Sequence, residues 1–296
     1  MTTEITELKI SNKDWQSHKP TWCPGCGDFG VLSSTRKALV NLQWSPDNTV
    51  VVSGIGCSSN FPHFLSAYGI HTLHGRANPV AQGVKMANPD LNVIIAGGDG
   101  DGLAIGIGGF VHAARRNMDL TYIIMDNQVY GLTVNQASPT STMDRKTKST
   151  PYGNIEQPLN PIALALSMGA SFVARTFSGE GKQFEAIMQA AMEHKGFAFI
   201  DALSPCVTFN RVNTKEYFKE RVFDVNERGH DKTDLAAAFA ASQGWEEGIP
   251  TGIFYQVERA TYESMDETIA RSGNVVKRGA NHMSVDYRTK VENKHR

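Results

Sequence analysis

Short runs of β-branched and apolar residues alternate with stretches of helical apolar spacing along the first two thirds of the chain. The apolar runs predict six strands, at 49–55, 70–73, 92–96, 120–125, 171–177 and 197–203. The periodic stretches predict helices at 31–42, 79–86, 103–116, 161–168 and 182–194. Alternation of strands with helices favours an α/β fold with a doubly wound, mostly parallel sheet.

The pattern changes after Cys206, where charged and polar segments replace this alternation. We expect one helix in that region, at 233–242, and little contribution to the core. The change divides the chain into three parts: an N-terminal arm (1–20), a core domain (21–209), and a C-terminal extension (210–296) that packs on the domain or on a partner. Within the core domain, 128–160 is a long polar segment, and segments of this kind are usually functional.

The central unit of the chain, 92–133, contains a strand, a glycine-rich loop, a helix and a second strand. Such a crossover brings the loop at 97–102 and the segment at 126–132 to the same edge of a parallel sheet. Open α/β folds bind ligands at this edge. Because glycines let backbone N–H groups approach an anion, the loop is a candidate phosphate site.

The glycine-rich loop also carries Asp99 and Asp101, and neither a lysine nor an arginine accompanies them. Two carboxylates would repel a bare phosphate, whereas a magnesium ion held by Asp99 and Asn127 could bridge carboxylates and a diphosphate. The dinucleotide fingerprint fails, since Leu103 stands where its third glycine belongs, and the phosphate-loop lysine is missing. A glycine-rich turn that only connects a strand to a helix is the alternative interpretation.

Four cysteines lie at the ends of segments that a parallel sheet can bring to one edge. Cys23 and Cys26 form a CxxC pair before the first helix, while Cys57 and Cys206 each follow a strand. Four thiolates can hold a zinc ion or a 4Fe-4S cluster, and their spacing does not distinguish the two. Cysteines without a metal and a redox-active CxxC pair are two further interpretations of the same pattern.

The overall composition gives no electrostatic signal for a nucleic-acid or membrane partner, because the formal net charge is −1. The N-terminal stretch has neither a basic nor an apolar leader region, and no apolar run reaches about 18 residues. We therefore expect a cytoplasmic protein, in which disulfides are disfavoured.

Six sequence segments taken together resemble one protein family, although none of them does so alone. They occur in the order WCPGCGDFG, GIGCSSNFPHF, HTLHGRANPVAQG, GGDGDGLAIG, MDNQVYGLTVNQASPTS and SPCVTFN. Over 21–210 the chain resembles the β subunit of 2-oxoacid:ferredoxin oxidoreductases, most of all the 2-oxoglutarate branch, 2-oxoglutarate synthase. The resemblance implies the fold that binds the diphosphate half of thiamine diphosphate, with a 4Fe-4S cluster beside it.

The resemblance also implies a role for individual residues. The expected ligands are the thiolates of Cys23, Cys26, Cys57 and Cys206 for the 4Fe-4S cluster, and Asp99, Asn127 and the carbonyl of Val129 for Mg²⁺. The residues expected around thiamine diphosphate are Gly56, Ser58, His74, Gly75, Gly98, Asp99, Gly100, Asp101, Asn127, Tyr130, Gly131, Leu132 and Thr133. Candidates that face the substrate are Asn60, Leu132 and His74. The glutamate that activates the cofactor is expected in the α subunit, so no catalytic residue is assigned here.

The implied reaction interconverts 2-oxoglutarate, coenzyme A and oxidised ferredoxin with succinyl-coenzyme A, carbon dioxide and reduced ferredoxin. Pyruvate or a broad range of 2-oxoacids is the alternative. Some relatives carry a lysine where Asn60 stands, which could pair with a distal carboxylate, so the cationic partner is expected here in the α subunit. The implied partners are an α subunit, in an α2β2 assembly of heterodimers, and ferredoxin. The direction of the reaction is not readable from the residues, although the carbon dioxide-fixing direction is that of the reductive TCA cycle.

Two further functions compete with this one. A thiamine diphosphate enzyme without electron transfer keeps the glycine-rich site and uses the cysteines for a structural zinc. A non-catalytic, zinc-stabilised binding subunit treats the glycine-rich loop as a turn. Either alternative leaves the coincidence of metal-type cysteines and a magnesium-diphosphate loop on one sheet edge unexplained.

Several polar residues are expected to have only structural roles. His63, His71 and His112 lie in apolar or helical stretches and are expected to be packed or surface histidines. The basic cluster at 145–148 is expected to be solvated or to face a subunit, with binding of coenzyme A phosphates or of ferredoxin as the alternative.

Overall fold

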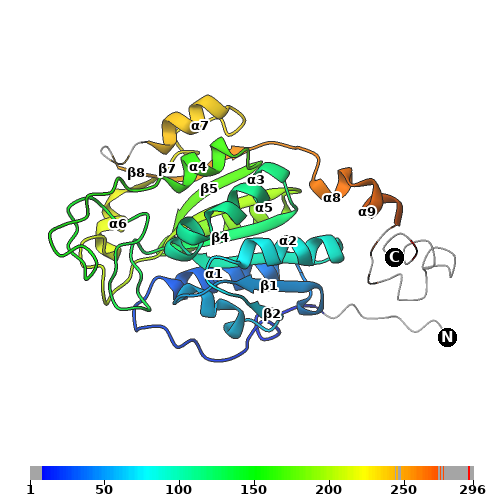
Figure 1. The fold of residues 1–296 in the computed structure, drawn as a ribbon, viewed down its shortest axis with the longest axis horizontal. Helices are drawn as coiled ribbons and strands as arrows, with labels where there is room; N and C mark the ends of the chain where they lie inside the picture. The colour runs from blue at the N-terminus through cyan, green and yellow to red at the C-terminus, as the bar shows by residue number, and fades with distance from the viewer. Residues whose placement is uncertain are drawn as a thin grey trace.

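The computed structural model describes residues 9–243, 245, 248–272, 274, 276 and 293, and one eight-stranded sheet runs through it (Figure 1). The strand order is β2-β1-β3-β4-β6-β5-β8-β7. The strands are β1 (Thr49–Ser53), β2 (Tyr68–His71), β3 (Asn92–Gly98), β4 (Leu120–Asp126), β5 (Phe172–Phe177), β6 (Phe197–Leu203), β7 (Val222–Asp224) and β8 (Ile249–Gln256). Neighbouring strands are parallel except for the antiparallel pair β5 and β8.

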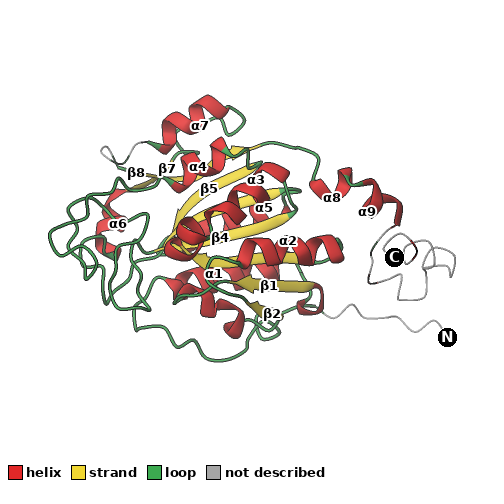
Figure 2. Ribbon diagram, viewed as in Figure 1, coloured by secondary structure: helices red, strands yellow, loops and turns green. Residues whose placement is uncertain are grey.

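Helices cover both faces of the sheet (Figure 2). The α-helices are α1 (Asp28–Asn41), α2 (Ala77–Ala87), α3 (Ile107–Arg116), α4 (Pro161–Ser167), α5 (Gly181–Glu193), α6 (Lys215–Arg221), α7 (Leu235–Ser242), α8 (Tyr262–Met265) and α9 (Glu267–Ser272). Shorter turns are the 3-10 helices η1 (Pro46–Asn48) and η2 (Ser58–Phe64) and the π-helix η3 (Asp101–Ile105). This architecture confirms the predicted doubly wound, mostly parallel α/β fold.

Two hydrophobic cores form because alternate side chains of each central strand point to opposite faces of the sheet. On one face, α1 and α5 pack over Ile94 and Ile123. On the other face, α2, α3, α4 and α7 pack over Ile95 and Ile124. Strand β4 is buried along its whole length, so it lies between the two cores. The carboxyl ends of β1, β3 and β4 are thereby fixed at one edge of the sheet.

The predicted helix at 103–116 is interrupted in the structure. The π-helix η3 follows the glycine-rich loop, Ala104 has non-helical backbone angles, and α3 begins only at Ile107. The glycine-rich loop therefore leads into η3 and not into a long helix. Single π-turns of this kind occur frequently at functional sites.

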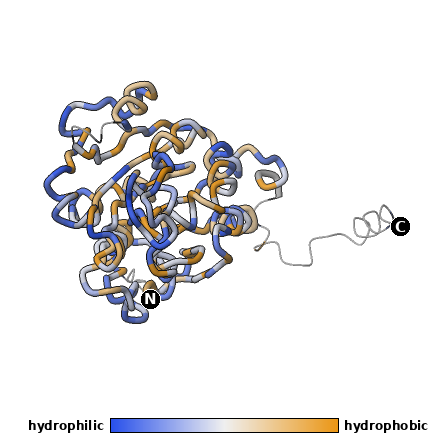
Figure 3. The backbone as a smooth tube through the Cα atoms, turned by 60° about the vertical axis from the view of Figure 1, so that its left-hand side comes forward, coloured by the Kyte–Doolittle hydropathy of each residue, from blue (hydrophilic) through white to orange (hydrophobic). Residues whose placement is uncertain are grey.

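The C-terminal region contributes more to the sheet than the sequence predicted. The expectation of little core beyond 210 was wrong, because β7 and β8 extend the sheet, and Ile249 and Phe254 are fully buried. The predicted helix at 233–242 is present as α7, whose apolar sequence LAAAFAAS is visible at the top of Figure 3. Residues 1–8 of the expected N-terminal arm, and much of the chain beyond 272, lie outside the described residues. No helix among the described residues is both long and apolar enough to cross a bilayer.

Candidate cofactor-binding site

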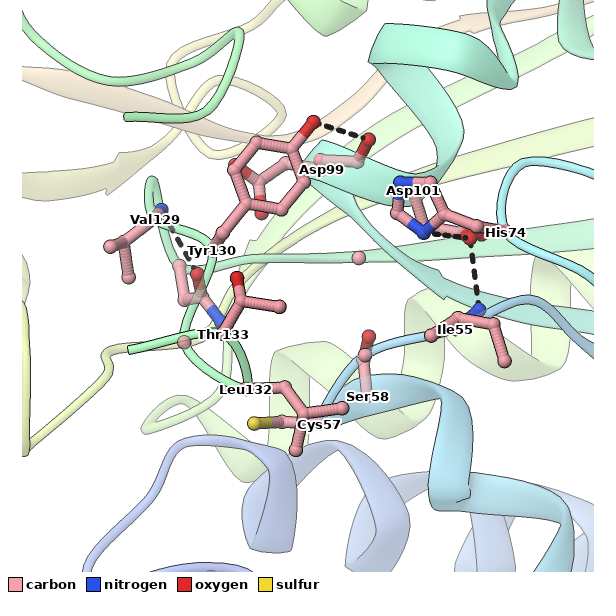
Figure 4. Close-up of a pocket in the computed structure, with 15 residues that line it drawn as sticks. Ile55, Cys57, Ser58, His74, Asp99, Asp101, Val129, Tyr130, Leu132 and Thr133 are labelled. Atoms are coloured by element: carbon pink, nitrogen blue, oxygen red, sulfur yellow. Dashed lines mark hydrogen bonds and ion pairs between the residues drawn. The ribbon is translucent and has the colours of Figure 1, made fainter. Parts of the chain in front are cut away.

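A pocket lies where β1, β3 and β4 end (Figure 4). The residues that line it are Ile55, Gly56, Cys57, Ser58, His74, Gly98, Asp99, Gly100, Asp101, Asn127, Val129, Tyr130, Gly131, Leu132 and Thr133. Every residue predicted to surround thiamine diphosphate or to hold magnesium lines this pocket except Gly75. The backbone N–H of Gly75 donates to Asp101, which does line the pocket. The structure thus brings together segments that are up to about 80 residues apart because parallel strands end at a common edge.

Asp99 is a buried carboxylate on the floor of the site. Its Oδ2 accepts a hydrogen bond from Thr140 Oγ1 at 2.7 Å, and the same hydroxyl lies 2.8 Å from Oδ1 of Asp126. Burial raises the pKa of Asp99, and burial together with the nearby charge of Asp99 raises the pKa of Asp126 well above its usual range. The ion pairs of the described residues leave both carboxyls without a cationic partner.

The donor set around Asp99 fits a hard divalent cation. Asn127 lies in the same pocket, and its side-chain oxygen accepts from the N–H of Val129 at 3.1 Å, which orients the amide. Carboxylate, amide and carbonyl oxygens are the ligands that magnesium prefers. A cation here would supply the counter-charge that Asp99 and Asp126 lack among the described side chains.

The glycines of the loop are required by close packing. A Cβ atom on Gly100 would lie 2.2 Å from Cε1 of Tyr130, and one on Gly98 would lie 2.9 Å from Oγ of Ser58. The Tyr130 hydroxyl donates to the carbonyl of Gly100 at 3.0 Å, so the ring is held across the loop. Burial raises the pKa of Tyr130, which keeps the phenol protonated as a donor. A side chain at either glycine would displace Tyr130 or Ser58, which line the pocket.

Asp101 faces two neighbouring loops. Its Oδ1 accepts from the backbone N–H of Ile55 at 2.9 Å and of Gly75 at 2.7 Å, and His74 Nδ1 lies 3.2 Å away. A Cβ atom on Gly54 would lie 2.0 Å from Oδ2 of Asp101, so that glycine is needed for the carboxyl to enter. Asp101 therefore joins the loops after β1 and β2 to η3.

A backbone hydrogen bond and a side-chain hydrogen bond hold the three cysteine-bearing segments together beside the pocket. The N–H of Gly27 donates to the carbonyl of Pro205 at 3.1 Å, and Trp22 Nε1 donates to the carbonyl of Cys57 at 2.6 Å. A Cβ atom on Gly131 would lie 3.6 Å from the sulfur of Cys57 and 3.8 Å from that of Cys206. The CxxC loop, the end of β1 and the end of β6 thus meet at one place.

The environment of the thiols opposes their ionisation. Burial and the nearby Asp28 carboxylate raise the pKa of Cys57 to about 11, and the same two causes raise the pKa of Cys26. Thiolates here would need adjacent positive charge, which iron or zinc provides. In the described part of the chain, no three or more Cys, His, Asp or Glu side chains are already gathered around one metal position. The cluster therefore stays a prediction, with a donor set that fits it.

Three further expectations from the sequence have different outcomes. Asn60 is half-buried in η2 and does not line the described pocket, whereas Leu132 lies at the mouth of the pocket with 55% of its surface exposed. Arg145 is buried, and its guanidinium donates to the carbonyls of Gln128 and Phe209. The expectation of a solvated Arg145 was therefore wrong, while Lys146 and Lys148 are exposed.

Sequence reasoning missed three polar residues around the site. Thr140 and Asp126 form the hydrogen-bonded link to Asp99, and Asp28 is fully buried beside the thiols, where Ser204 donates to it. Asp126 ends an apolar strand and Asp28 directly follows the CxxCG motif, so both positions carried a detectable signal. Thr140 lies in a loop, and no local pattern indicates its contact with Asp99.

Comparisons with known proteins match this geometry. The family model of the thiamine pyrophosphate enzyme C-terminal TPP binding domain matches residues 54–202, and that of the C-terminal part of the pyruvate ferredoxin oxidoreductase β chain matches 206–271. A 2-oxoacid:ferredoxin oxidoreductase β subunit of Saccharolobus solfataricus is 50% identical over 82% of this chain and 84% of its own length. A 2-oxoglutarate synthase subunit KorB of Archaeoglobus fulgidus is 43% identical over 67% of this chain and 74% of its own length.

A solved structure extends the similarity to the whole fold. It is described as 2-oxoglutarate:ferredoxin oxidoreductase from Magnetococcus marinus with 2-oxoglutarate, coenzyme A and succinyl-CoA bound. It matches with a TM-score of 0.87 and 40% sequence identity, and the match covers 98% of this chain and 97% of that chain. Identity of 50% over most of both chains, together with a thiamine diphosphate fold, leaves one assignment. The chain belongs to the β subunits of the 2-oxoacid:ferredoxin oxidoreductases.

Proposed function

We propose that this β subunit works in a 2-oxoglutarate:ferredoxin oxidoreductase, which converts 2-oxoglutarate, coenzyme A and oxidised ferredoxin into succinyl-coenzyme A, carbon dioxide and reduced ferredoxin, or the reverse. The observation that carries the proposal is the common wall between the carboxylate pocket and the thiols, where Gly131 lines the pocket beside the sulfurs of Cys57 and Cys206. The active assembly pairs this chain with an α subunit as α2β2.

In this proposal each part of the site has a defined task. Asp99, Asn127 and the carbonyl of Val129 hold magnesium, and Cys23, Cys26, Cys57 and Cys206 hold one 4Fe-4S cluster. When bound, thiamine diphosphate stabilises the carbanion left by decarboxylation, and an all-cysteine cluster accepts single electrons at low potential. Tyr130 closes the glycine-rich loop, because its hydroxyl donates to Gly100.

The choice of 2-oxoglutarate is supported by relatives. KorB subunits of Mycobacterium tuberculosis and Archaeoglobus fulgidus are 42% and 43% identical to the chain, and the Magnetococcus marinus structure holds 2-oxoglutarate. A broad 2-oxoacid range is the second candidate, because the Saccharolobus solfataricus relative carries that broader name. The described pocket lining contains no lysine or arginine, so the cationic partner of a distal carboxylate belongs to the α subunit.

Anaerobic purification with the co-expressed α subunit tests the proposal. We expect brown protein with about four irons per β chain, as a cubane cluster requires, and ferredoxin reduction that depends on 2-oxoglutarate far more than on pyruvate. Colourless protein that contains zinc would remove the cluster from this chain. Equal rates with both acids would favour the broad enzyme.

Matched variants assign the ligands. Cys206→Ser should lower the iron content, whereas Val207→Ala, which changes a neighbouring exposed side chain, should not. Asp99→Asn should weaken magnesium-dependent binding of thiamine diphosphate, whereas Asp47→Asn on the exposed η1 turn should leave it unchanged. Full iron in Cys206→Ser, or unchanged cofactor affinity in Asp99→Asn, would contradict the assignment.

A further inference from the structure

His74 is the only imidazole in the described pocket lining, where the other ionisable side chains are Asp99, Asp101, Tyr130 and Cys57. Its side chain is 39% exposed, so the ring borders both the pocket and solvent. An imidazole is the one group in this set that can take up and release a proton near neutral pH without a large perturbation. Figure 4 shows the ring beside Asp101.

Asp101 fixes the ring of His74 through a rigid support. Its Oδ1 accepts the backbone N–H groups of Ile55 and Gly75, and His74 Nδ1 lies 3.2 Å from the same oxygen. Gly75 adopts a positive φ of 71° and packs so closely that a Cβ atom would lie 2.5 Å from Ile105. The backbone on the C-terminal side of His74 is therefore fixed, which limits the positions that the imidazole can take.

This contact determines which nitrogen of His74 is free. Because a carboxylate only accepts hydrogen bonds, the tautomer that suits this contact carries its proton on Nδ1, toward Asp101. In the neutral ring, Nε2 then presents a lone pair. When Nε2 takes up a proton, the carboxylate of Asp101 stabilises the imidazolium, as in other carboxylate-histidine pairs that handle protons.

We propose that His74 is the general base of this subunit, that it takes the thiol proton of coenzyme A when the thioester forms, and that Asp101 is its positioning residue. The inference rests on the proposed function. Conversion of a 2-oxoacid and a thiol into a thioester, carbon dioxide and two electrons on ferredoxin also releases one proton. The S–H bond of coenzyme A breaks, the N–H bond at Nε2 forms, and the proton then leaves to solvent through the exposed edge of the ring.

The groups that surround His74 suit this assignment. Asp101 is in direct contact, and the ring of Tyr130 lies at a centroid distance of 6.1 Å. Asp99 and Cys57 line the same pocket, while the neighbouring Arg76 is exposed to solvent. His74 thus has one carboxylate in direct contact and an open side toward solvent, which a positioned proton acceptor needs.

Three variants of the co-expressed subunit pair test the inference: His74→Gln, Asp101→Asn and the control His71→Gln. Asp101→Asn keeps a carbonyl oxygen that can accept from Ile55 and Gly75, but it removes the charge. His71 ends the neighbouring strand β2, and its Nδ1 lies 3.1 Å from Ser53 Oγ. Co-purification with the α subunit and a wild-type circular dichroism spectrum show that each variant folds.

The kinetic expectation separates His74 from the other two positions. His74→Gln should lower kcat for thioester formation about 100-fold, the low end for general base catalysis, with little change in KM for coenzyme A. It should also abolish the loss of rate at acid pH that protonation of the base causes in the wild type. Asp101→Asn should give a smaller loss of kcat, and His71→Gln, which removes only a weaker electrostatic interaction with Asp101, a smaller loss still. An unchanged kcat and pH profile in His74→Gln would overturn the inference.

A chemical measurement gives a readout that does not depend on turnover. Diethyl pyrocarbonate modifies neutral imidazole nitrogen, and peptide mass spectrometry follows its reaction at His74 in the cofactor-free subunit pair. We expect coenzyme A to slow this reaction at His74 and not at His71, whereas equal rates with and without coenzyme A would overturn the inference. An inactive wild-type pair in which coenzyme A still protects His74 would refute the proposed function and leave the assignment of Nε2 standing.

Discussion

Gly100→Ala tests whether the pocket depends on the packing of the glycine-rich loop against Tyr130. The backbone at Gly100 is helical, with φ −66° and ψ −35°, so alanine introduces no backbone strain. The new methyl group would lie 2.2 Å from Cε1 of the Tyr130 ring, which must move by roughly 1.5 Å to reach van der Waals contact. The movement also breaks the 3.0 Å bond from the Tyr130 hydroxyl to the Gly100 carbonyl.

The expected cost follows from these two effects. Overpacking costs about 1–3 kcal/mol and a lost hydrogen bond about 1 kcal/mol, and we expect about 2 kcal/mol, the low end of their sum, because the half-buried Tyr130 ring can move. If this loss appears in cofactor binding, the Kd of thiamine diphosphate rises roughly 30-fold. The assay is fluorescence quenching by thiamine diphosphate in the co-purified subunit pair at saturating magnesium.

Two controls isolate the cause. Gly108→Ala, in α3, places a methyl group where nothing lies within 4 Å, and it should leave the Kd unchanged. In a Tyr130→Ala background, Gly100→Ala should have little further effect because the ring that it displaces is gone. An unchanged Kd in Gly100→Ala, or an equal increase in the Tyr130→Ala background, would refute the reasoning.

Three further predictions concern buried polar groups. The fully buried carboxylate of Asp201 lies 2.8 Å from the guanidinium of Arg175. Arg175→Met removes this cation and should lower the free energy of unfolding by about 3–5 kcal/mol in urea denaturation. The double variant Arg175→Met/Asp201→Leu should recover most of this loss. Thr140→Val removes the hydroxyl that donates to Asp99 and should raise the Kd of magnesium about 10-fold by titration, while Thr140→Ser should not. Burial lowers the pKa of His194 below 6.5, so the unfolded chain binds more protons at this residue. The free energy of unfolding should therefore be highest above pH 6.5 and fall as the pH drops below it. In denaturation at several pH values, His194→Asn should remove this part of the pH dependence.

The sequence predicted those parts of the fold that local pattern determines. The predicted strand at 197–203 coincides with β6, and the predicted strand at 120–125 differs from β4 by one residue. Both are continuous apolar runs, which is how strands buried on two faces are encoded. The position of the pocket followed from the same pattern, since its glycine-rich loop and Asn127 directly follow β3 and β4.

What the sequence did not predict depends on contacts between distant residues. Strand β8 contains Pro250 and Gly252, which normally argue against a strand, and it forms by antiparallel pairing with β5. Arg145 resembles a solvated charge in a basic run, yet its guanidinium binds a carbonyl 64 residues away, that of Phe209. Neither feature has a local signal, because each depends on how the completed sheet places its neighbours.

Gly131 shows how thin the boundary between the two halves of the site is. It lines the pocket on one side, and a Cβ atom built on it would lie within 4 Å of the sulfurs of Cys57 and Cys206 on the other. In the proposed function, electrons would pass from the pocket to a cluster held by these sulfurs, and a partition one residue thick would keep that distance short. A bulky residue at this position would lengthen the distance that electrons have to cross.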